Sequence, residues 1–240
     1  GKSDCILIES DKNVLIDAGD NDHQYEVVDY INKLGIKKLD YVVNTHPDAD
    51  HCGGMDKIVE YFDIGQVFVG NGNSDKKTYK KFIEALADKK LNPSVPLEQS
   101  ILEIGEDTTI QFFNSRNTSE DTNETSLVVL LSCENKKALF TGDITSDVEK
   151  DLLEYFPKVD ILKVAHHGSS HSTSNELLEK IQPKYAIICT GKNEYGHPTK
   201  QTLYRLEECG AKIYRTDEDG SIIVSIGNKS IWIETKKRGK

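Results

Sequence analysis

The sequence predicts an α/β fold in which two layers of helices and strands enclose a shared β core. In the first part of the chain, apolar β-branched runs alternate with segments whose apolar residues recur with a 3.6-residue period. From about residue 101 to 140 the pattern changes to short β runs, and the rest of the chain returns to the alternation. No Pro-, Gly- or Ser-rich linker separates these parts, so we expect a single domain over residues 1–240.

Each element follows from local signals. The predicted strands are apolar runs bounded by turn residues, and they occupy residues 5–10, 13–19, 39–45, 64–70, 108–113, 126–132, 137–142, 159–165, 185–191, 211–216, 221–226 and 230–236. The predicted helices are amphipathic, and they occupy residues 25–35, 55–62, 79–91, 146–156, 175–181 and 202–210. Because the chain opens inside a strand-like pattern, G-K-S-D-C-I-L-I, we expect its first strand to be truncated.

The composition is that of a soluble globular protein, with 37% hydrophobic and 29% charged residues. No apolar run approaches the roughly 20 residues that a membrane-spanning helix needs. The net charge of −10 argues against broad, non-specific binding of polyanions. Basic residues do gather at 76–81, where a solvated helix face is the ordinary explanation. The five scattered cysteines form neither a disulfide framework nor a thiolate zinc site.

Acidic and imidazole side chains recur just past the ends of predicted strands, where α/β sheets usually place their sites. These residues are Asp17, His46, Asp48, Asp50, His51, Asp143, His166, His167 and His197. Imidazole nitrogen and carboxylate oxygen together suit zinc, manganese or iron. We therefore interpret the loop at 46–51 as a metal site, and we expect Gly53 and Gly54 to let the backbone turn tightly into the next helix.

The loop H-P-D-A-D-H resembles the H-x-H-x-D-H signature of the metallo-β-lactamase superfamily, with Asp48 where the second histidine usually stands. The resemblance continues in order with L-I-D-A-G at Asp17, T-G-D at Asp143 and then L-K-V-A-H-H-G-S. Together with G-K-N-x-Y-G-H-P and Y-R-T-D-x-D-G, these stretches are similar to the soluble hydrolase domains of the ComEC family of DNA-uptake competence proteins. The resemblance spans essentially the whole chain and implies an αββα sandwich of two mixed sheets flanked by helices.

The resemblance also implies two divalent metal ions, zinc or manganese. In the superfamily the first two donors of the loop bind one metal, the last two bind the second, and the T-G-D aspartate bridges both. One histidine of the H-H-G-S pair completes the second metal, and we favour the first of the two. The implied ligands are His46, Asp48, Asp50, His51, Asp143 and His166.

The chain departs from the superfamily pattern at one point. Most relatives supply a further histidine between the loop and T-G-D, but no histidine occurs between His51 and His166. The corresponding stretch is D-T-N-E-T-S-L-V-V-L, so Asn123 either takes that place or leaves it open. The first metal would then be held weakly, or by harder oxygen ligands that tolerate manganese.

Catalytic roles follow from the same resemblance and from side-chain chemistry. Asp50 corresponds to the residue that orients the nucleophile. His167 and His197 would either donate a proton to the leaving alkoxide or bind a phosphate oxygen. Ser169 and Ser170, in a glycine-containing turn before a helix, are candidates for hydrogen bonds to a phosphate.

The leading hypothesis is a metal-dependent phosphodiesterase or nuclease acting on DNA. The alternative, which the acidic net charge favours, is a hydrolase of a small phosphodiester or a lactone with the same metals. A non-catalytic relative has no chemical need for this residue set and is disfavoured. The sequence leaves the oligomeric state open, and the location is either the cytoplasm or, for a ComEC-like origin, the exterior of a bacterial cell.

Overall fold

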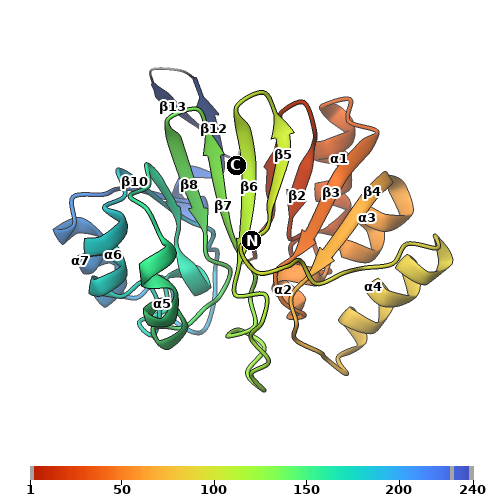
Figure 1. The fold of residues 1–240 in the computed structure, drawn as a ribbon, viewed down its shortest axis with the longest axis horizontal. Coiled ribbons are helices and arrows are strands. Elements are labelled where there is room, and N and C mark those ends of the chain that lie inside the picture. The colour runs from red at the N-terminus through yellow and green to blue at the C-terminus, as the bar shows by residue number, and fades with distance from the viewer. Residues whose placement is uncertain (1–2, 228–229, 238–240) are drawn as a thin grey trace. The chain divides into compact units, whose positions relative to one another are not determined.

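The computed structural model describes residues 3–227 and 230–237, which form two compact units (Figure 1). The amino-terminal unit consists of Ser3–Glu106 and Phe112–Val128. The carboxy-terminal unit consists of Asp107–Gln111 and the described residues from Val129 onward. The expectation of a single domain stays a prediction. The expected truncation of the first strand also stays a prediction.

The amino-terminal unit is built on a four-stranded mixed sheet. Its strands lie in the order β1 (Ile6–Ile8), β2 (Val14–Ile16), β3 (Lys38–Asn44) and β4 (Asp63–Val69). β1 runs antiparallel to β2, whereas β2, β3 and β4 are parallel to one another. Because β2 and β3 are parallel neighbours, the residues that follow them lie at the same edge of the sheet. This places Asp17 beside Thr45.

Helices of the amino-terminal unit cover this sheet through one apolar core. They are α1 (Gln24–Lys33), the short α2 (Ala49–Cys52), α3 (Met55–Tyr61) and α4 (Lys77–Asp88), and β5 (Ile101–Gly105) belongs to the same unit. The core joins strand side chains to helix side chains, among them Leu15, Val42, Val67, Val28, Ile31, Ile58, Phe82 and Leu86. Each such side chain contributes roughly 1.5–3 kcal/mol to the stability of the fold when it is fully buried. This packing fixes the sheet edge that carries Asp17.

The carboxy-terminal unit contains a second mixed sheet. Its strands follow one another in the order β11 (Lys212–Arg215), β10 (Tyr185–Ile188), β9 (Ile161–Lys163), β8 (Lys136–Phe140) and β7 (Val128–Cys133). β7 pairs antiparallel with β8, and β8, β9, β10 and β11 are parallel. The parallel ends of β8 and β9 bring Asp143 and His166 to one edge of this sheet.

The remaining elements of the carboxy-terminal unit are helices and one hairpin. The helices are α5 (Ser146–Leu152), α6 (Asn175–Ile181), α7 (Lys200–Glu208) and α8 (Thr216–Asp219). β12 (Ser221–Ile226) and β13 (Ile231–Lys236) form a separate antiparallel pair. β6 (Thr108–Phe113) and β7 each contain residues of both units. Within the described residues, no helix has the length and apolarity needed to cross a membrane.

The α/β class, with mixed sheets flanked by helices, is confirmed. The differences from the sequence-based elements are local. The helix expected over 146–156 ends at Leu152 and continues as a 3-10 turn, η1 (Leu153–Tyr155). The strand expected over 159–165 ends at Lys163, and a second 3-10 turn, η2 (Ala165–Gly168), follows it and carries both histidines of the H-H-G-S pair.

Candidate metal ligands

The segment 46–51, predicted as a loop, runs from the end of β3 into α2 in the amino-terminal unit and brings two imidazoles together. The rings of His46 and His51 have their centroids 4.1 Å apart. Both side chains belong to residues that are at most 1% exposed. Burying polar rings this completely is unfavourable unless their nitrogens find partners, so the hydrogen bonds around them decide what the loop can do.

The two glycines that follow the loop have a different function from the one expected. Gly53 and Gly54 have φ angles of −60° and −94°, which any residue adopts. The constraint is space, because a Cβ on Gly53 would collide with the backbone of Ala49 and of residues 20 and 21. A Cβ on Gly54 would collide with the carbonyl oxygen of Ala18. The glycines therefore allow the loop to pack closely against the segment that follows β2.

The carboxylate of Asp17 organises the loop from this neighbouring segment. Its Oδ1 accepts a hydrogen bond from the backbone N–H of Thr45 at 2.8 Å. Its Oδ2 lies 2.7 Å from the Thr45 hydroxyl oxygen and 2.7 Å from Nδ1 of His51. An ionised carboxylate only accepts hydrogen bonds, so both the Thr45 hydroxyl and the His51 Nδ1 donate to it.

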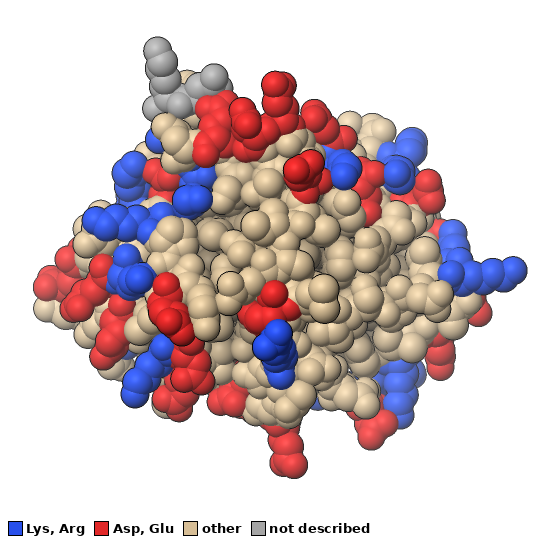
Figure 2. Space-filling model, in the orientation of Figure 1, with Lys and Arg blue, Asp and Glu red and all other residues tan. Residues whose placement is uncertain are grey.

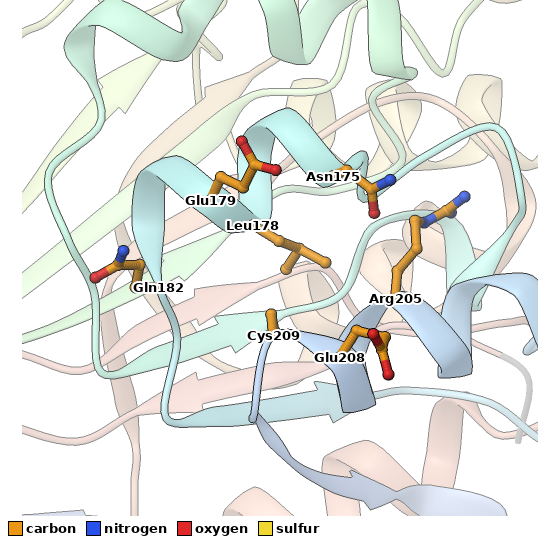
Figure 3. Close-up of a pocket in the computed structure, with 7 residues that line it drawn as sticks. All are labelled: Asn175, Leu178, Glu179, Gln182, Arg205, Glu208 and Cys209. Carbon is orange, nitrogen blue, oxygen red and sulfur yellow. The ribbon is translucent and has the colours of Figure 1, made fainter.

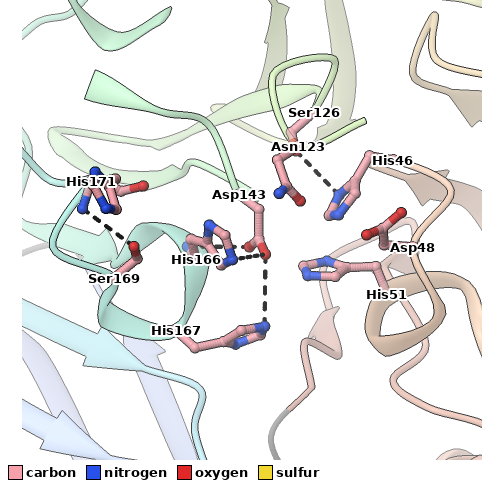
Figure 4. Close-up of polar contacts among 12 residues, drawn as sticks. His46, Asp48, His51, Asn123, Ser126, Asp143, His166, His167, Ser169 and His171 are labelled. Atoms are coloured by element: carbon pink, nitrogen blue, oxygen red, sulfur yellow. Dashed lines mark hydrogen bonds and ion pairs between the residues drawn. The ribbon is translucent and has the colours of Figure 1, made fainter. Parts of the chain in front are cut away.

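These donations fix the tautomer of both imidazoles. Nδ1 of His51 carries the proton, which leaves the electron pair on Nε2. The Thr45 hydroxyl has its single proton directed at Asp17, so its oxygen accepts from Nδ1 of His46 at 3.1 Å. The Ser126 hydroxyl lies at the same distance from that Nδ1 (Figure 4). Both rings therefore present Nε2 as an electron-pair donor, the state required of a histidine metal ligand.

Asp17 is held in this position at a conformational cost. Its φ angle of 56° lies in the left-handed region, which is unfavourable for a residue other than glycine. Burial by itself raises the pKa of this carboxyl, but the neighbouring His51, His46 and Thr45 outweigh that effect and lower the pKa below its ordinary value of 3.8. Strain of this kind persists only where surrounding contacts over-determine the conformation. Asp17 is therefore an ionised, buried anchor.

Asp48, the predicted ligand in place of a histidine, lies in a different environment. Its side chain is 24% exposed, and its Oδ1 is 2.8 Å from Nζ of Lys76. The Thr122 hydroxyl donates to the same oxygen at 2.9 Å. Burial raises the pKa of Asp48, but Lys76, His46 and Thr122 lower it further than burial raises it. The residue is an ionised carboxylate already bonded to a cation.

The other residues predicted in this unit lie near the loop. Asp50 is part of α2 and is half-buried. Asn123 lies three residues before Ser126 and accepts a hydrogen bond from the backbone N–H of Ser126 through its own carbonyl. One acidic residue that the sequence-based set omits, Asp4, is 1% exposed and has Oδ2 3.8 Å from Nδ1 of His51.

Asp4, Asp17 and His51 together present ligand-type atoms within 4.8 Å of one another. The Asp17 oxygens are already acceptors for Thr45 and His51, so this group supports the loop rather than binding a metal itself. Thr45 and Ser126 were also absent from the sequence-based set. Hydroxyl residues are common, and only their hydrogen bonds to His46 distinguish these two.

The carboxy-terminal unit supplies a second set of donors at the ends of β8 and β9. Asp143 is 2% exposed and lies between the two histidines of η2 (Figure 4). Its Oδ2 is 3.9 Å from Nε2 of His166 and 3.7 Å from Nε2 of His167. These separations exceed hydrogen-bond length. Its Oδ1 accepts from the backbone N–H of His166 at 3.2 Å and has Nζ of Lys163 at 3.8 Å.

The two histidines of η2 differ in burial and orientation. The His166 side chain is 30% exposed, whereas that of His167 is 8% exposed. Nδ1 of His167 lies 2.8 Å from the carbonyl oxygen of Cys189. A carbonyl only accepts, so Nδ1 carries the proton and Nε2 keeps its electron pair toward Asp143. Nε2 of His167 and Oδ2 of Asp143 thus both present electron pairs, and they lie 3.7 Å apart. An imidazole nitrogen and a carboxylate oxygen are both common metal ligands.

Both histidines adopt left-handed backbone conformations, with φ of 48° for His166 and 52° for His167. The loop that follows them is held from two sides. The buried Glu149 carboxylate accepts from the backbone N–H groups of Thr173 and Ser174, and Arg205 donates to the carbonyl oxygens of residues 170 and 172. Burial raises the pKa of Glu149, and these hydrogen bonds oppose the rise. The strained turn is thus fixed by a buried polar network.

The predicted substrate contacts in this unit have mixed outcomes. Ser169 is buried, and its hydroxyl accepts from the backbone N–H of residue 171 at 3.3 Å. Ser170 is half-buried. His197 is half-buried with its ring centroid 5.5 Å from that of His166, and burial, together with the neighbouring imidazoles, lowers its pKa below 6.5. At pH 7 its ring is therefore mostly neutral.

A separate hollow lies between α6 and α7 (Figure 3). Its lining combines polar, charged and apolar side chains from these two helices and their carboxyl ends, namely Asn175, Leu178, Glu179, Gln182, Arg205, Glu208 and Cys209. None of the predicted ligands lines it, and we assign it no part in the chemistry.

The chain matches the model of the metallo-β-lactamase superfamily over residues 1–192. It belongs to this superfamily. A ComE operon protein 3 of Bacillus subtilis is 30% identical over 202 residues, which are 82% of this chain and 26% of that protein. The competence protein ComA of Neisseria gonorrhoeae is 25% identical over 238 residues, or 96% of this chain and 32% of that protein.

The chain thus spans about a quarter to a third of the length of these relatives. Among solved structures, the metallo-β-lactamase fold protein YhfI of Bacillus subtilis superposes with a TM-score of 0.58 at 13% identity, covering 89% of this chain and 88% of that one. This likeness confirms the fold alone. Family membership and this likeness together assign the chain the fold of the metallo-β-lactamase superfamily.

The donor chemistry of the chain fits such a metal. Three buried histidines, His46, His51 and His167, have Nδ1 engaged by an acceptor that leaves Nε2 as the electron-pair donor. Carboxylates accompany them in each unit. Imidazole held by a second hydrogen bond in this way is the usual arrangement around zinc and related divalent ions.

The Asp17 anchor makes a prediction about stability and pH. A carboxyl whose pKa is lower in the folded than in the unfolded state stabilises the fold above its unfolded pKa, and this contribution is lost as the pH falls through the folded value. We expect Asp17→Asn to lower the free energy of unfolding at pH 7 by about 1–3 kcal/mol. The amide nitrogen of asparagine is a hydrogen-bond donor, and it would face the donors of Thr45 and His51. The difference from wild type should shrink below pH 3.8.

Urea unfolding of both proteins in chelator, from pH 7 to pH 3, measures this. Asp40→Asn is the matched control, since Asp40 lies on β3, just before the loop, and has as partners the exposed Lys38 and the backbone N–H of Asn13. The pair of Asp40 and Lys38 should contribute less than about 1 kcal/mol. A difference between wild type and Asp17→Asn that stays constant with pH would contradict the assignment of an ionised Asp17.

Proposed function

We propose that this chain is a metal-dependent phosphodiesterase that acts on DNA. The observation that carries the proposal is the shared state of His46, His51 and His167. Each is buried with Nδ1 committed to an acceptor, so that each offers Nε2 to an electrophile. The relatives supply the substrate class, because one of them is named a competence protein and the sequence resembles DNA-uptake proteins.

The proposed ligands would hold up to two divalent ions, zinc or manganese. They are Nε2 of the three histidines together with carboxylates, in the set His46, Asp48, Asp50, His51, Asp143 and His167. The sequence favoured His166, whereas we now propose His167. The reason is that His167 is less exposed and has its tautomer fixed by a carbonyl oxygen. His166 keeps a partly exposed ring beside His197.

Bound divalent ions would supply Lewis acidity, lowering the pKa of water at the site and stabilising charge that develops on the phosphate. The chain's own residues then divide the remaining work. Asp50 would orient the attacking water. His166 and His197, whose ring centroids lie 5.5 Å apart, would contact the phosphate or donate a proton to the leaving oxygen. Ser170 and Asn123 are further candidates for contact with the substrate.

A small phosphodiester or a lactone is the second candidate substrate, and the charge distribution favours it. The chain carries a net charge of −10. On the face in Figure 2, lysine and arginine side chains are interspersed with aspartate and glutamate rather than gathered into one broad patch. Within the basic run at 76–81, Lys76 pairs with Asp48 and Lys80 pairs with Asp75. Binding of DNA would therefore depend on individual contacts near the proposed metal ligands and not on a broad basic surface.

An assay of the metal-reconstituted protein separates these candidates. It compares single-stranded DNA, bis-p-nitrophenyl phosphate and a lactone at equal enzyme concentration. Cleavage of DNA and of the activated phosphodiester, with no lactone hydrolysis, is the expected result. Activity on the lactone alone would contradict the phosphodiesterase proposal.

The choice between the two histidines of η2 is testable by metal affinity. We expect His167→Gln to weaken the binding of zinc by at least about 10-fold, because it removes a buried, pre-oriented nitrogen. His166→Gln should change the affinity by much less, since that ring is partly exposed. Competition of the metal-loaded proteins with a chromophoric chelator measures both. The reverse order of effects would restore His166 as the ligand.

Replacement of Asp143 should harm catalysis more than folding. Asp143→Asn is expected to lose at least ~10²–10³-fold in phosphodiesterase rate, the scale seen when one electrostatic catalytic group is removed. The variant should remain folded because β8 and α5 keep their apolar packing. Asp147→Asn, on the exposed surface of α5, is the control and should keep full rate. Steady-state hydrolysis of bis-p-nitrophenyl phosphate with circular dichroism measures rate and fold together.

His197 should matter only where the leaving group needs a proton. We expect His197→Ala to spare bis-p-nitrophenyl phosphate, whose leaving group departs as an anion, and to slow cleavage of DNA by roughly 10²-fold. Parallel rate measurements on the two substrates test this. An equal loss on both would instead assign His197 to phosphate binding.

A further inference from the structure

The side chain of Lys76 reaches into the metal loop of the amino-terminal unit. Lys76 precedes α4, and its Nζ lies 2.8 Å from Oδ1 of Asp48. The Thr122 hydroxyl donates to that same oxygen at 2.9 Å. A carboxylate oxygen has two lone-pair positions, and these two donors occupy both. Any cation that approaches this oxygen must displace one of them.

The pairing occurs at the position where the superfamily signature usually has its second histidine. A histidine there is a neutral nitrogen ligand that a lysine would not attract. In this chain the ligand is an anion, and the nearest cation already belongs to the protein. The ammonium also repels a divalent ion on the same carboxylate, because like charges a few ångströms apart repel each other, and solvent screens this repulsion where the lysine is exposed.

The remaining donors around Asp48 are few. No histidine occurs between His51 and His166, so the loop itself supplies one imidazole, His46, and one carboxylate, Asp48, for a first metal. The Asn123 region offers amide and hydroxyl groups, which bind divalent ions less strongly than imidazole. A site with so few strong donors is sensitive to any competing cation.

We propose that Lys76 is a built-in competitor for the first metal position. In this role its ammonium neutralises Asp48 and keeps the affinity of the His46–Asp48 position low, so that this position fills only at high metal concentration. This inference rests on the proposed metal-dependent function and deepens it, because it makes the affinity for the second equivalent of metal depend on Lys76.

The chain offers matched controls for this role. Lys76 is 57% exposed, and it makes no side-chain cap hydrogen bond to α4, so its removal should not disturb the helix. Lys80 lies on α4 itself, is 56% exposed and pairs with the exposed Asp75 at 3.0 Å. Lys80→Met therefore removes one positive charge from the same region without contact with Asp48. Lys76→Arg keeps a cation in place.

The experiment counts metal bound to the full chain. Metal-free wild type, Lys76→Met, Lys76→Arg and Lys80→Met are dialysed against increasing Mn²⁺, and bound ion is measured by elemental analysis, with free Mn²⁺ followed by electron paramagnetic resonance. Wild type should bind one equivalent tightly and a second weakly. Lys76→Met should tighten the second step by roughly threefold to tenfold, the scale of a partly exposed ion pair, while the other two variants match wild type.

Two results would overturn the inference alone. Identical binding curves for wild type and Lys76→Met would show that Lys76 does not compete with the metal. An equal gain in Lys80→Met would show a general charge effect instead of a specific one. In both cases metal binding, and with it the proposed function, would stand. An absence of Mn²⁺ and Zn²⁺ binding in all four proteins would overturn the proposed function and the inference together.

Discussion

The buried carboxylate of Asp17 is the interaction on which the amino-terminal donors depend. An ionised group that is 1% exposed carries a desolvation penalty of several kcal/mol unless hydrogen bonds compensate it. Thr45 and His51 provide that compensation, and in doing so they take fixed protonation states. Through the Thr45 hydroxyl the same carboxylate also determines the tautomer of His46. One anion at the end of β2 thereby prepares two imidazoles at the end of β3.

The carboxy-terminal unit reaches the same chemical state by a different route. There a backbone carbonyl, that of Cys189 after β10, takes the place of a carboxylate and fixes Nδ1 of His167. The orientation requires two consecutive residues in the left-handed region, a cost of about 1–2 kcal/mol for each. The following loop donates backbone hydrogen bonds to Glu149 and accepts hydrogen bonds from Arg205, and these bonds offset the cost. Polar side chains distant from His166 and His167 thus stabilise the backbone conformation of these two histidines.

Local charge around Asp48 differs from the net charge of the chain. The chain is acidic overall, yet the carboxylate of Asp48 pairs with Lys76, which precedes α4. The aspartate that stands where the superfamily signature usually has a histidine is therefore not an isolated difference. It comes with a cation and a hydroxyl that share the new negative charge. The residue type at position 48 does not by itself reveal that Lys76 and Thr122 contact its carboxylate.

The sequence by itself determined the α/β class, the superfamily and the residues of chemical interest, because apolar periodicity and short-range motif spacing are properties of the chain. It did not identify Asp4, Thr45 or Ser126 as supporting residues, and it misjudged why Gly53 and Gly54 are needed. Those functions arise from segments far apart in the chain, such as Ser126 beside His46 and the Ala18 backbone beside Gly54. The preference for His167 over His166 likewise depends on a carbonyl 22 residues away. Only tertiary structure decides such pairings, since a hydrogen bond depends on position in space and leaves no periodic trace in sequence.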